Sequence, residues 1–320
     1  MLIRDPRNPI ITPDMIPDIF PQIVDATSVF NSGAIKIGEK YILLLRVQNR
    51  GRQTFLLFAE SDNGINFTIR PEIIKWQGLE KLPQQPYHIY DPRIHLIDGR
   101  YYIMFAMDFE HGCELGLGVT DDFETYSFLG VVSDGDYRNG VMFPEKIDGF
   151  YLRYDRPNRS SLNSTAASGS DIWLSRSKDL LNWQPVSRVM GGRLHFWDEF
   201  IGAGPPPIKI REGWLQIYHG IAIHLASIYI YQVGVFLADI NDPAQVIARS
   251  TCNILEPRTL YELTGQVPNV CFPNGIVVED FDEVGYALPD SEVKIYYGAA
   301  DTVLALATTT IEKLLTAARS

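Results

Sequence analysis

Short apolar segments recur in pairs along the whole chain. The first segment of each pair follows a glycine or a charged turn, and these segments are residues 41–47, 101–107, 150–154, 214–219 and 293–297. A second segment follows each of them, at residues 55–59, 115–119, 171–175, 233–237 and 303–307. Apolar runs of this length, bounded by turn residues and rich in aromatic and β-branched side chains, predict β-strands.

The first three pairs run into a similar turn. Residues 61–67, 120–126 and 177–183 each begin with Ser or Thr, continue through polar residues and end on an aromatic side chain. The closing aromatics Phe67, Tyr126 and Trp183 lie 59 and then 57 residues apart. A hydroxyl or carboxylate that bonds to its own backbone, with an aromatic packed under the turn, is typical of a hairpin. The turn degenerates in the last two pairs, at residues 239–243 and 308–312.

The repeat predicts the fold. One small sheet cannot bury both of its faces until similar sheets pack around a common axis, so five strand pairs at a spacing near 60 residues predict a five-bladed β-propeller. We expect residues 1–320 to form a single domain. A β-sandwich followed by a tail is the alternative. The polar stretch 159–170 is predicted to be a loop inserted between two strands of the third blade, near the site.

Composition narrows the class of partner. A chain of 320 residues with 46% hydrophobic content can bury a full core, and its formal net charge of −11 repels phosphate backbones and anionic lipids. Nucleic acid and membrane surfaces are therefore not expected partners, whereas a homo-oligomer is compatible with the sequence. The three cysteines form no CxxC pair, and no apolar leader segment is present. We expect a cytoplasmic protein, or a periplasmic or secreted one if a signal peptide has been removed.

Charged and titratable residues lie near the ends of the predicted inner strands. These are Arg46, Asp91, Arg156, His219 and Asp301. Each taken singly is more typical of a turn, an ion pair or a bonded core histidine, but their recurrence from blade to blade favours a ligand site at the axial mouth. A mouth rich in aromatic rings and carboxylates suits sugars. Motifs for nucleotide loops, zinc proteases, serine hydrolases and calcium loops are missing from the sequence.

Eight ordered motifs extend over nearly the whole chain. They are residues 8–12, 29–33, 90–93, 139–147, 202–208, 213–220, 268–273 and 296–301. Through these motifs the chain resembles glycoside hydrolase family 130, whose members are five-bladed propeller enzymes acting on β-mannosides. Many members of that family are phosphorylases and some are hydrolases, and both cleave with inversion.

The resemblance implies roles for the residues that match the family's motifs. Asp91, in the Tyr-Asp-Pro-Arg motif, would be the general acid and would act through a hydroxyl of the mannosyl residue. Asn31, Arg46 and Asp301 would hold the mannose next to the cleaved bond, and Arg93 of the same motif is grouped with these substrate-binding residues.

A phosphorylase also needs a cationic cradle for the attacking phosphate. The resemblance implies Arg156, with His219 and Tyr218 adjacent, as this phosphate or water site. No metal or organic cofactor is expected, and inorganic phosphate would be the co-substrate of a phosphorylase.

One position departs from the phosphorylase pattern. Phosphorylases usually carry a lysine before the Ile-Gly-Ala-Gly run, and Phe200 stands in that place. A charge-assisted contact to phosphate is worth about 1.5–3 kcal/mol, so its loss weakens phosphate binding by about one to two orders of magnitude. Asp198 and Glu199 directly precede Phe200, the position that lacks the lysine, and a carboxylate there could activate water instead.

The departure favours hydrolysis, with Asp91 as general acid and Glu199 as general base. Because adjacent strand residues face opposite sides, Asp198 is the alternative base. Phosphorolysis survives if Lys146, Arg153 or Lys209 reaches the vacated position.

Two other functions stay open, a carbohydrate-binding propeller without activity and a mannosyl transferase that uses a sugar nucleotide. The linkage, β-1,2 or β-1,4, has no signature in the sequence.

Overall fold

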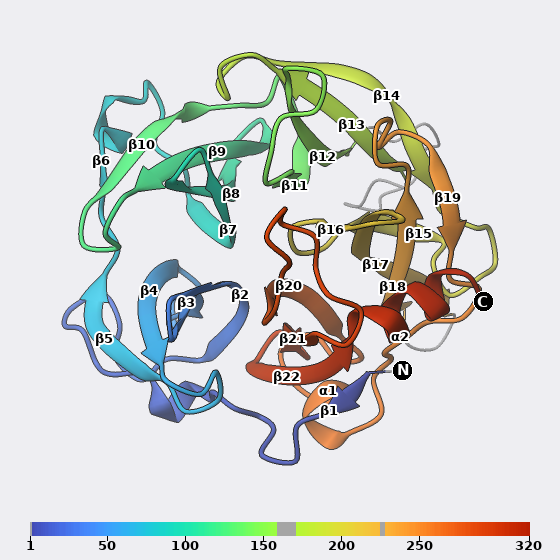
Figure 1. Ribbon diagram of the computed structural model, residues 1–320. Helices are drawn as coiled ribbons and strands as arrows, with labels where there is room; N and C mark the ends of the chain where they lie inside the picture. The colour runs from blue at the N-terminus through green and yellow to red at the C-terminus, as the bar shows by residue number, and fades with distance from the viewer. Residues whose placement is uncertain (1, 159–170, 225–227) are drawn as a thin grey trace.

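The computed structural model describes residues 2–158, 171–224 and 228–320, and it has five small antiparallel sheets arranged around a central axis (Figure 1). The prediction of a five-bladed β-propeller is confirmed. The predicted loop at residues 159–170 lies outside the described residues. No helix in the described part of the chain is long and apolar enough to cross a membrane.

Each blade is a meander that runs outward from the axis. Blade one contains β2 (Ser28–Ile37), β3 (Lys40–Gln48), β4 (Thr54–Ser61) and β5 (Thr68–Ile73). Blade two contains β7 (His88–Ile97), β8 (Arg100–Phe109), β9 (Gly112–Thr120) and β10 (Tyr126–Val131), with β6 (Trp76–Gln77) parallel to β10. Blade three contains β11 (Tyr137–Met142), β12 (Tyr151–Pro157), β13 (Asp171–Ser177) and β14 (Trp183–Gly191).

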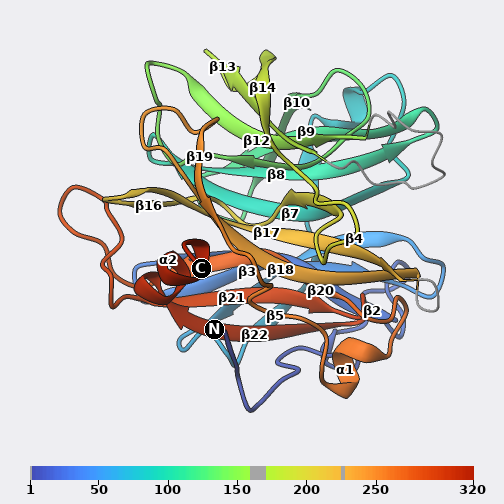
Figure 2. The same ribbon diagram turned by 90° about the vertical axis from the view of Figure 1, so that its right-hand side faces the viewer.

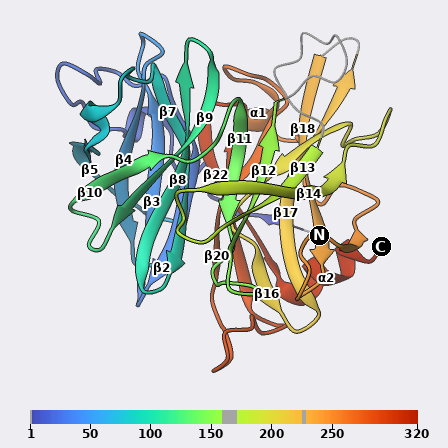
Figure 3. The same cartoon turned by 90° about the horizontal axis from the view of Figure 1, so that it is seen from above.

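Blade four contains β15 (Phe200–Ala203), β17 (Gly213–His224), β18 (Ile228–Ala238) and β19 (Val246–Arg249), with β16 (Ile208–Ile210) also paired to β17. Blade five contains β20 (Cys271–Val278), β21 (Glu292–Ala299), β22 (Val303–Thr310) and β1 (Ile3–Arg4). The helices are η1 (Pro13–Met15), η2 (Leu79–Lys81), α1 (Leu260–Leu263) and α2 (Ile311–Ala318). Figures 2 and 3 show the blades from the side and from above.

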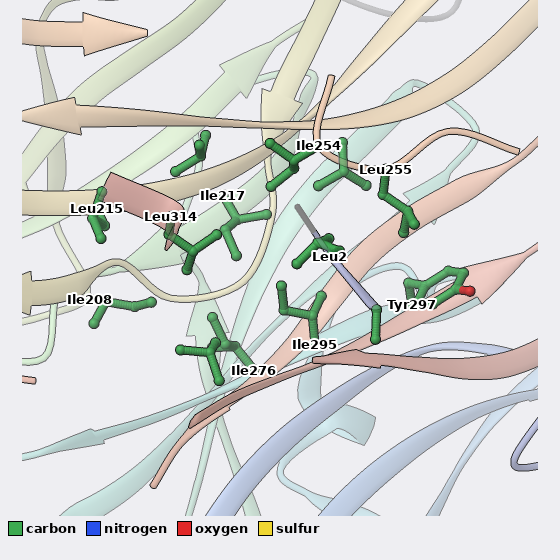
Figure 4. Packing of buried hydrophobic residues seen from close by; sticks show 14 of the residues in the cluster. Leu2, Ile208, Leu215, Ile217, Ile254, Leu255, Ile276, Ile295, Tyr297 and Leu314 are labelled. Carbon is green, nitrogen blue, oxygen red and sulfur yellow. The ribbon is translucent and has the colours of Figure 1, made fainter. Parts of the chain in front are cut away.

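The ring is closed by its two ends. The N-terminal strand β1 pairs with β22, so the fifth blade contains strands from both termini. Arg4 of β1 forms a 2.7 Å ion pair with Glu262 of α1, whose side chain is buried. Leu2 joins a hydrophobic cluster with Ile217 of blade four and Ile295 of blade five (Figure 4). Burial of each such apolar side chain contributes about 1.5–3 kcal/mol to stability, so this cluster stabilises the closed ring.

The predicted turns form as expected. Asn63, Asp122 and Asp179 each accept hydrogen bonds from backbone amides two and three residues further along. Asp239 makes the same pair of bonds in the degenerate turn of blade four. The polar residue satisfies amides at the bend that the sheet ladder leaves free, which is why the motif recurs.

The innermost strands are not the ones that the sequence predicted. The predicted first segments are the second strands of their blades, and the strands along the axis are β2, β7, β11, β15 and β20. Polar residues, glycines and prolines interrupt the inner strands and hide their apolar alternation. In β2, β7, β11 and β20 the interruption coincides with a shift in register, which marks a β-bulge.

Three of these bulges place an Asn or Asp residue in the left-handed region. Asn31, Asp91 and Asn139 have φ values of 47°, 53° and 55°. Asn and Asp tolerate this conformation better than other residues with a β-carbon. The repeated bulge therefore brings one short polar side chain per blade to the same end of the axis.

Candidate active site

Asp91 is held by two donors from blade one. Its side chain is nearly buried, and its Oδ1 accepts hydrogen bonds from Asn31 Nδ2 at 3.0 Å and from Arg46 Nη1 at 2.7 Å. The Arg46 guanidinium lies 4.2 Å from the ring centre of Phe30 and 4.6 Å from that of Tyr90. The Asp91 Oδ2 atom has no hydrogen bond among the described residues, so one carboxylate oxygen is fixed and the other is available to a ligand.

Asp301 lies on the same side of the axis. It occupies the turn after β21, with a φ of 47°. Burial raises the pKa of the Asp301 carboxyl to about 6, Arg46 opposes this rise and Asp91 adds to it. The three residues therefore form one electrostatic group in which a single guanidinium serves two carboxylates. The fold thus brings together Asn31, Asp91 and Asp301, from three separate motifs, and Arg46, from an apolar strand.

Close packing protects this group. A β-carbon on Gly298 of β21 would lie 2.2 Å from Asn31 Oδ1, so any larger residue would displace the Asn31 side chain. Asn274 of β20 donates to the backbone oxygens of Asn31 and Pro92, at 2.9 and 2.8 Å. The inner strands of blades one, two and five are thereby joined across the axis.

Arg93 hydrogen-bonds to the protein backbone. Its guanidinium donates to the carbonyl oxygens of Gly204 at 2.7 Å, Ala203 at 3.3 Å and Asp91 at 3.2 Å. Burial lowers its pKa to about 10, so it stays positive at neutral pH. Its nitrogens are directed at backbone oxygens of β7 and the β15 segment, and its predicted contact with substrate stays a prediction.

A cluster of cations lies beside this group. Arg138 and Arg156 are paired residues of β11 and β12, and Arg156 Nη1 lies 3.4 Å from His219 Nε2. The Nε atoms of both arginines are buried and have no partner among the described residues. Burial, with Arg156 and Arg93 nearby, lowers the pKa of His219 well below its usual range, so the imidazole is neutral.

The two guanidiniums differ in their surroundings. Burial and the neighbouring Arg138 lower the pKa of Arg156 to about 10. For Arg138, burial opposes the charge, but Tyr90, Cys113 and Asp108 outweigh burial and raise its pKa. Sequence reasoning chose Arg156 and His219 but missed Arg138. The signal was its position just before Asn139 in a motif that matches the bulges of Asn31 and Asp91.

Aromatic rings surround His219. Its ring centre lies 4.5 Å from that of Phe272 and 6.1 Å from that of Tyr231. A β-carbon on Gly202 of β15 would lie 2.4 Å from His219 Cε1 and 2.6 Å from Asn139 Oδ1. Because strand residues two apart share a face, Phe200 is on the Gly202 face of β15. The strand that carries Phe200 thus passes directly along the cation cluster.

Asp198 and Tyr218 belong to a different network. Asp198 is fully buried, pairs with Arg193 at 2.7 Å and Arg249 at 2.5 Å, and accepts a 2.8 Å hydrogen bond from the Tyr218 hydroxyl. The Tyr218 ring stacks on Trp197 at 5.7 Å, on the face of β17 opposite to His219. The structure therefore separates Tyr218 from Arg156 and His219. A carboxylate held by two guanidiniums and a hydroxyl has no free position for activating water, which removes the geometric basis for Asp198 as a base.

Glu199 is half-buried, and its carboxylate has no hydrogen bond or ion pair among the described residues. None of the three cations considered as substitutes for a lysine at Phe200 reaches the cluster. Lys146 faces Asp98, Lys209 pairs with Glu145 at 2.6 Å, and Arg153 is buried against Asp155 at 3.0 Å. The second guanidinium beside Arg156 is instead that of Arg138.

Comparison with known proteins gives a consistent result. A family model described as beta-1,4-mannooligosaccharide phosphorylase, of glycoside hydrolase family 130, matches residues 4–320. A beta-1,4-mannooligosaccharide phosphorylase of Ruminococcus albus is 30% identical over 318 residues, covering 98% of this chain and 89% of the relative. A 1,2-beta-oligomannan phosphorylase of Thermoanaerobacter is 32% identical over 294 residues, covering 88% of this chain and 90% of the relative.

The structure of a beta-1,2-mannobiose phosphorylase from Listeria innocua, in complex with beta-1,2-mannobiose, superimposes with a TM-score of 0.84 and 25% identity, covering 99% of both chains. The resemblance inferred from the eight motifs is thus confirmed at the level of the family. The chain belongs to glycoside hydrolase family 130.

Proposed function

We propose that this protein is an inverting β-mannoside phosphorylase that converts a β-mannoside and inorganic phosphate into α-mannose 1-phosphate and a shortened acceptor. The observation that carries the proposal is the cross-strand pair of Arg138 and Arg156, with neutral His219 beside Arg156. The Nε atoms of both arginines have no partner among the described residues. Arg156 is buried and the Arg138 side chain is about one-third exposed, and a bound dianion with several acceptor oxygens would relieve the repulsion between these two like charges.

The chemistry follows from the two halves of the site. Asn31, Arg46 and Asp301 would hold the terminal mannose, and Asp91 would give a proton to the leaving oxygen through a mannosyl hydroxyl. A phosphate oxygen held by Arg138 and Arg156 would attack the anomeric carbon from the opposite face. The bond to the acceptor breaks as the bond to phosphate forms, so the configuration at this carbon is inverted.

This proposal replaces hydrolysis as the favoured reaction. The hydrolysis hypothesis depended on a missing cation at Phe200, and Arg138 provides a second guanidinium near Arg156. The named relatives are phosphorylases acting on β-1,4 or β-1,2 linkages, which supports the same reaction and leaves both linkages as candidate substrates. Glu199 is the carboxylate on which hydrolysis would still depend.

The test is product analysis on β-1,2- and β-1,4-mannobiose, with and without millimolar phosphate. We expect mannose 1-phosphate that depends on phosphate, and Arg156→Gln should raise the phosphate KM by about 10-fold or more. Glu199→Gln should change neither product nor rate. Arg188→Gln is the control, because Arg188 pairs with Asp171 in an exposed ion pair away from the cluster. Free mannose formed at a rate indifferent to phosphate and lost in Glu199→Gln would instead establish a hydrolase.

A further inference from the structure

We propose that Tyr90 and Asp108 form a positioning pair that orients Arg138 toward the attacking phosphate. This inference rests on the proposed phosphorolysis. Neither residue needs to touch phosphate: they would act through the guanidinium of Arg138, and the pair would link the phosphate side of the site to the side that holds mannose.

The contacts form a continuous chain from blade two to blade three. The Tyr90 hydroxyl donates to Asp108 Oδ1 at 2.7 Å, and the same oxygen lies 3.8 Å from Arg138 Nη2. Tyr90 is buried, whereas the Arg138 and Asp108 side chains are about one-third exposed, at 33% and 32%. The buried Tyr90 phenol thus holds the Asp108 carboxylate, which would otherwise move in solvent. The carboxylate in turn fixes the position of Nη2 of Arg138.

Arg138 depends on this carboxylate for its orientation. Among the described residues, Asp108 is the only carboxylate within 4.0 Å of the Arg138 guanidinium. Arg156 is the cross-strand neighbour of Arg138, and the two like charges repel each other. The Cys113 thiol also contacts the Arg138 guanidinium, but it carries no charge at neutral pH, so without Asp108 no anion would oppose Arg156 and fix the orientation of Arg138. A guanidinium offers its donors in a fixed planar fork, so the angle at which it is held decides whether phosphate meets one donor or two.

Tyr90 also touches the mannose side. Its ring lies 4.6 Å from the Arg46 guanidinium, which donates to the proposed acid Asp91. Its hydroxyl also lies 3.5 Å from the buried Cys113 thiol. A change in the ring would therefore disturb both halves of the site, but removal of the hydroxyl alone would leave the ring under Arg46 and release only Asp108.

Two effects of opposite sign compete at Asp108. Its charge repels phosphate, so neutralising it would strengthen phosphate binding if charge alone mattered. Its contact with Arg138 orients the fork, so neutralising it would weaken binding if orientation matters more. Tyr90→Phe separates the two effects, because it loosens Asp108 without changing any charge.

The experiment measures KM for phosphate and KM for mannobiose in Tyr90→Phe and Asp108→Asn, together with calorimetric binding of inorganic phosphate in the absence of sugar. Tyr154→Phe is the matched hydroxyl control, since its buried hydroxyl also makes a 2.7 Å hydrogen bond, to the Pro243 carbonyl. Asp171→Asn is the matched carboxylate control, because Asp171 is likewise 32% exposed and pairs with Arg188 at 2.9 Å.

We expect both test variants to raise the phosphate KM and the phosphate Kd by about 3- to 10-fold, with the mannobiose KM within about 2-fold of wild type. The two controls should leave both constants unchanged. An equal rise in the KM for phosphate and the KM for mannobiose would indicate a merely structural role and would overturn the proposal.

Tighter phosphate binding in Asp108→Asn would also overturn it, since repulsion would then exceed orientation. If wild type itself neither binds phosphate nor forms mannose 1-phosphate, the proposed phosphorolysis fails and this inference fails with it. Failure of the proposed phosphorolysis can be distinguished from failure of this inference alone, because the wild type and both controls would then also lack phosphate binding and mannose 1-phosphate.

Discussion

Asp301 gives this site a cost in stability that depends on pH. Burial raises the pKa of its carboxyl from 3.8 to about 6. A carboxyl with a raised pKa favours the folded state fully below pH 4, and that contribution is lost as the pH rises through 6. The rise in this pKa from 3.8 to about 6 corresponds to about 3 kcal/mol of unfolding free energy, and the partial exposure of Asp301 reduces this to about 2 kcal/mol.

Asp301→Asn should therefore stabilise the protein at pH 7.5 by about 2 kcal/mol and change it little at pH 4. With an unfolding entropy of about 0.7 kcal/mol/K for 320 residues, this corresponds to a rise in Tm of about 3 °C. The assay is thermal unfolding of wild type and variant at both pH values. Asp290→Asn, at an exposed loop carboxylate, is the control and should show no difference between them.

A rise in Tm of the same size at both pH values would refute the reasoning, because removal of a raised pKa cannot stabilise the protein where both forms are protonated. A fall in Tm at pH 7.5 would show that the Arg46 interaction outweighs burial. Activity should be lost in the variant in either case, since the proposed mannose contact goes with the carboxylate.

Three further predictions concern neighbouring groups. Asp91→Asn should abolish turnover while mannose still binds in calorimetry, and full activity would overturn its role as acid. Gly298→Ala should raise the mannobiose KM at least about 10-fold with little change in the phosphate KM, because its β-carbon would lie 2.2 Å from Asn31 Oδ1. Asp198→Asn should lower stability by about 3 kcal/mol in thermal unfolding, as removal of a buried partner leaves Arg193 and Arg249 uncompensated, and unchanged Tm with lost activity would restore Asp198 as a base.

The fold was predictable from sequence because its repeat survives in the second and third strands of each blade. Those strands are apolar and end in turns whose chemistry is local, as at Asp122 and Asp179. The inner strands could not be predicted in the same way, because each of them both pairs in the sheet and carries a polar residue at a bulge. Residues such as Asn31 and Asp91 interrupt the ladder at a bulge, so an element with a functional bend has no clean alternation to detect.

The site was partly predictable for a related reason. Arg46, Asp91, Arg156 and Asp301 stood out as charges against apolar runs, and the fold brings them to one end of the axis. Side-chain direction was not predictable, so Tyr218 was grouped with His219 although neighbouring strand residues face opposite sides. Arg138 was missed because its importance comes from a partner on the next strand, Arg156, and cross-strand register is not visible in the sequence.

The bulges explain why a ring of similar blades has an asymmetric site. Asn31, Asp91 and Asn139 share a backbone conformation, yet Asn31 donates to Asp91 while Asn139 lies beside His219. Asn274 occupies the corresponding bulge of β20, and among the described residues its side chain bonds only to backbone oxygens, those of Asn31 in blade one and Pro92 in blade two. The repeated bulge thus places one short polar side chain from each of four blades near the axis, and the neighbouring side chains determine what each of them binds. Because Asn274 fixes the two strands that carry Asn31 and Asp91, the 3.0 Å contact between them is set by the scaffold before any ligand arrives, and binding of mannose need not organise the acid.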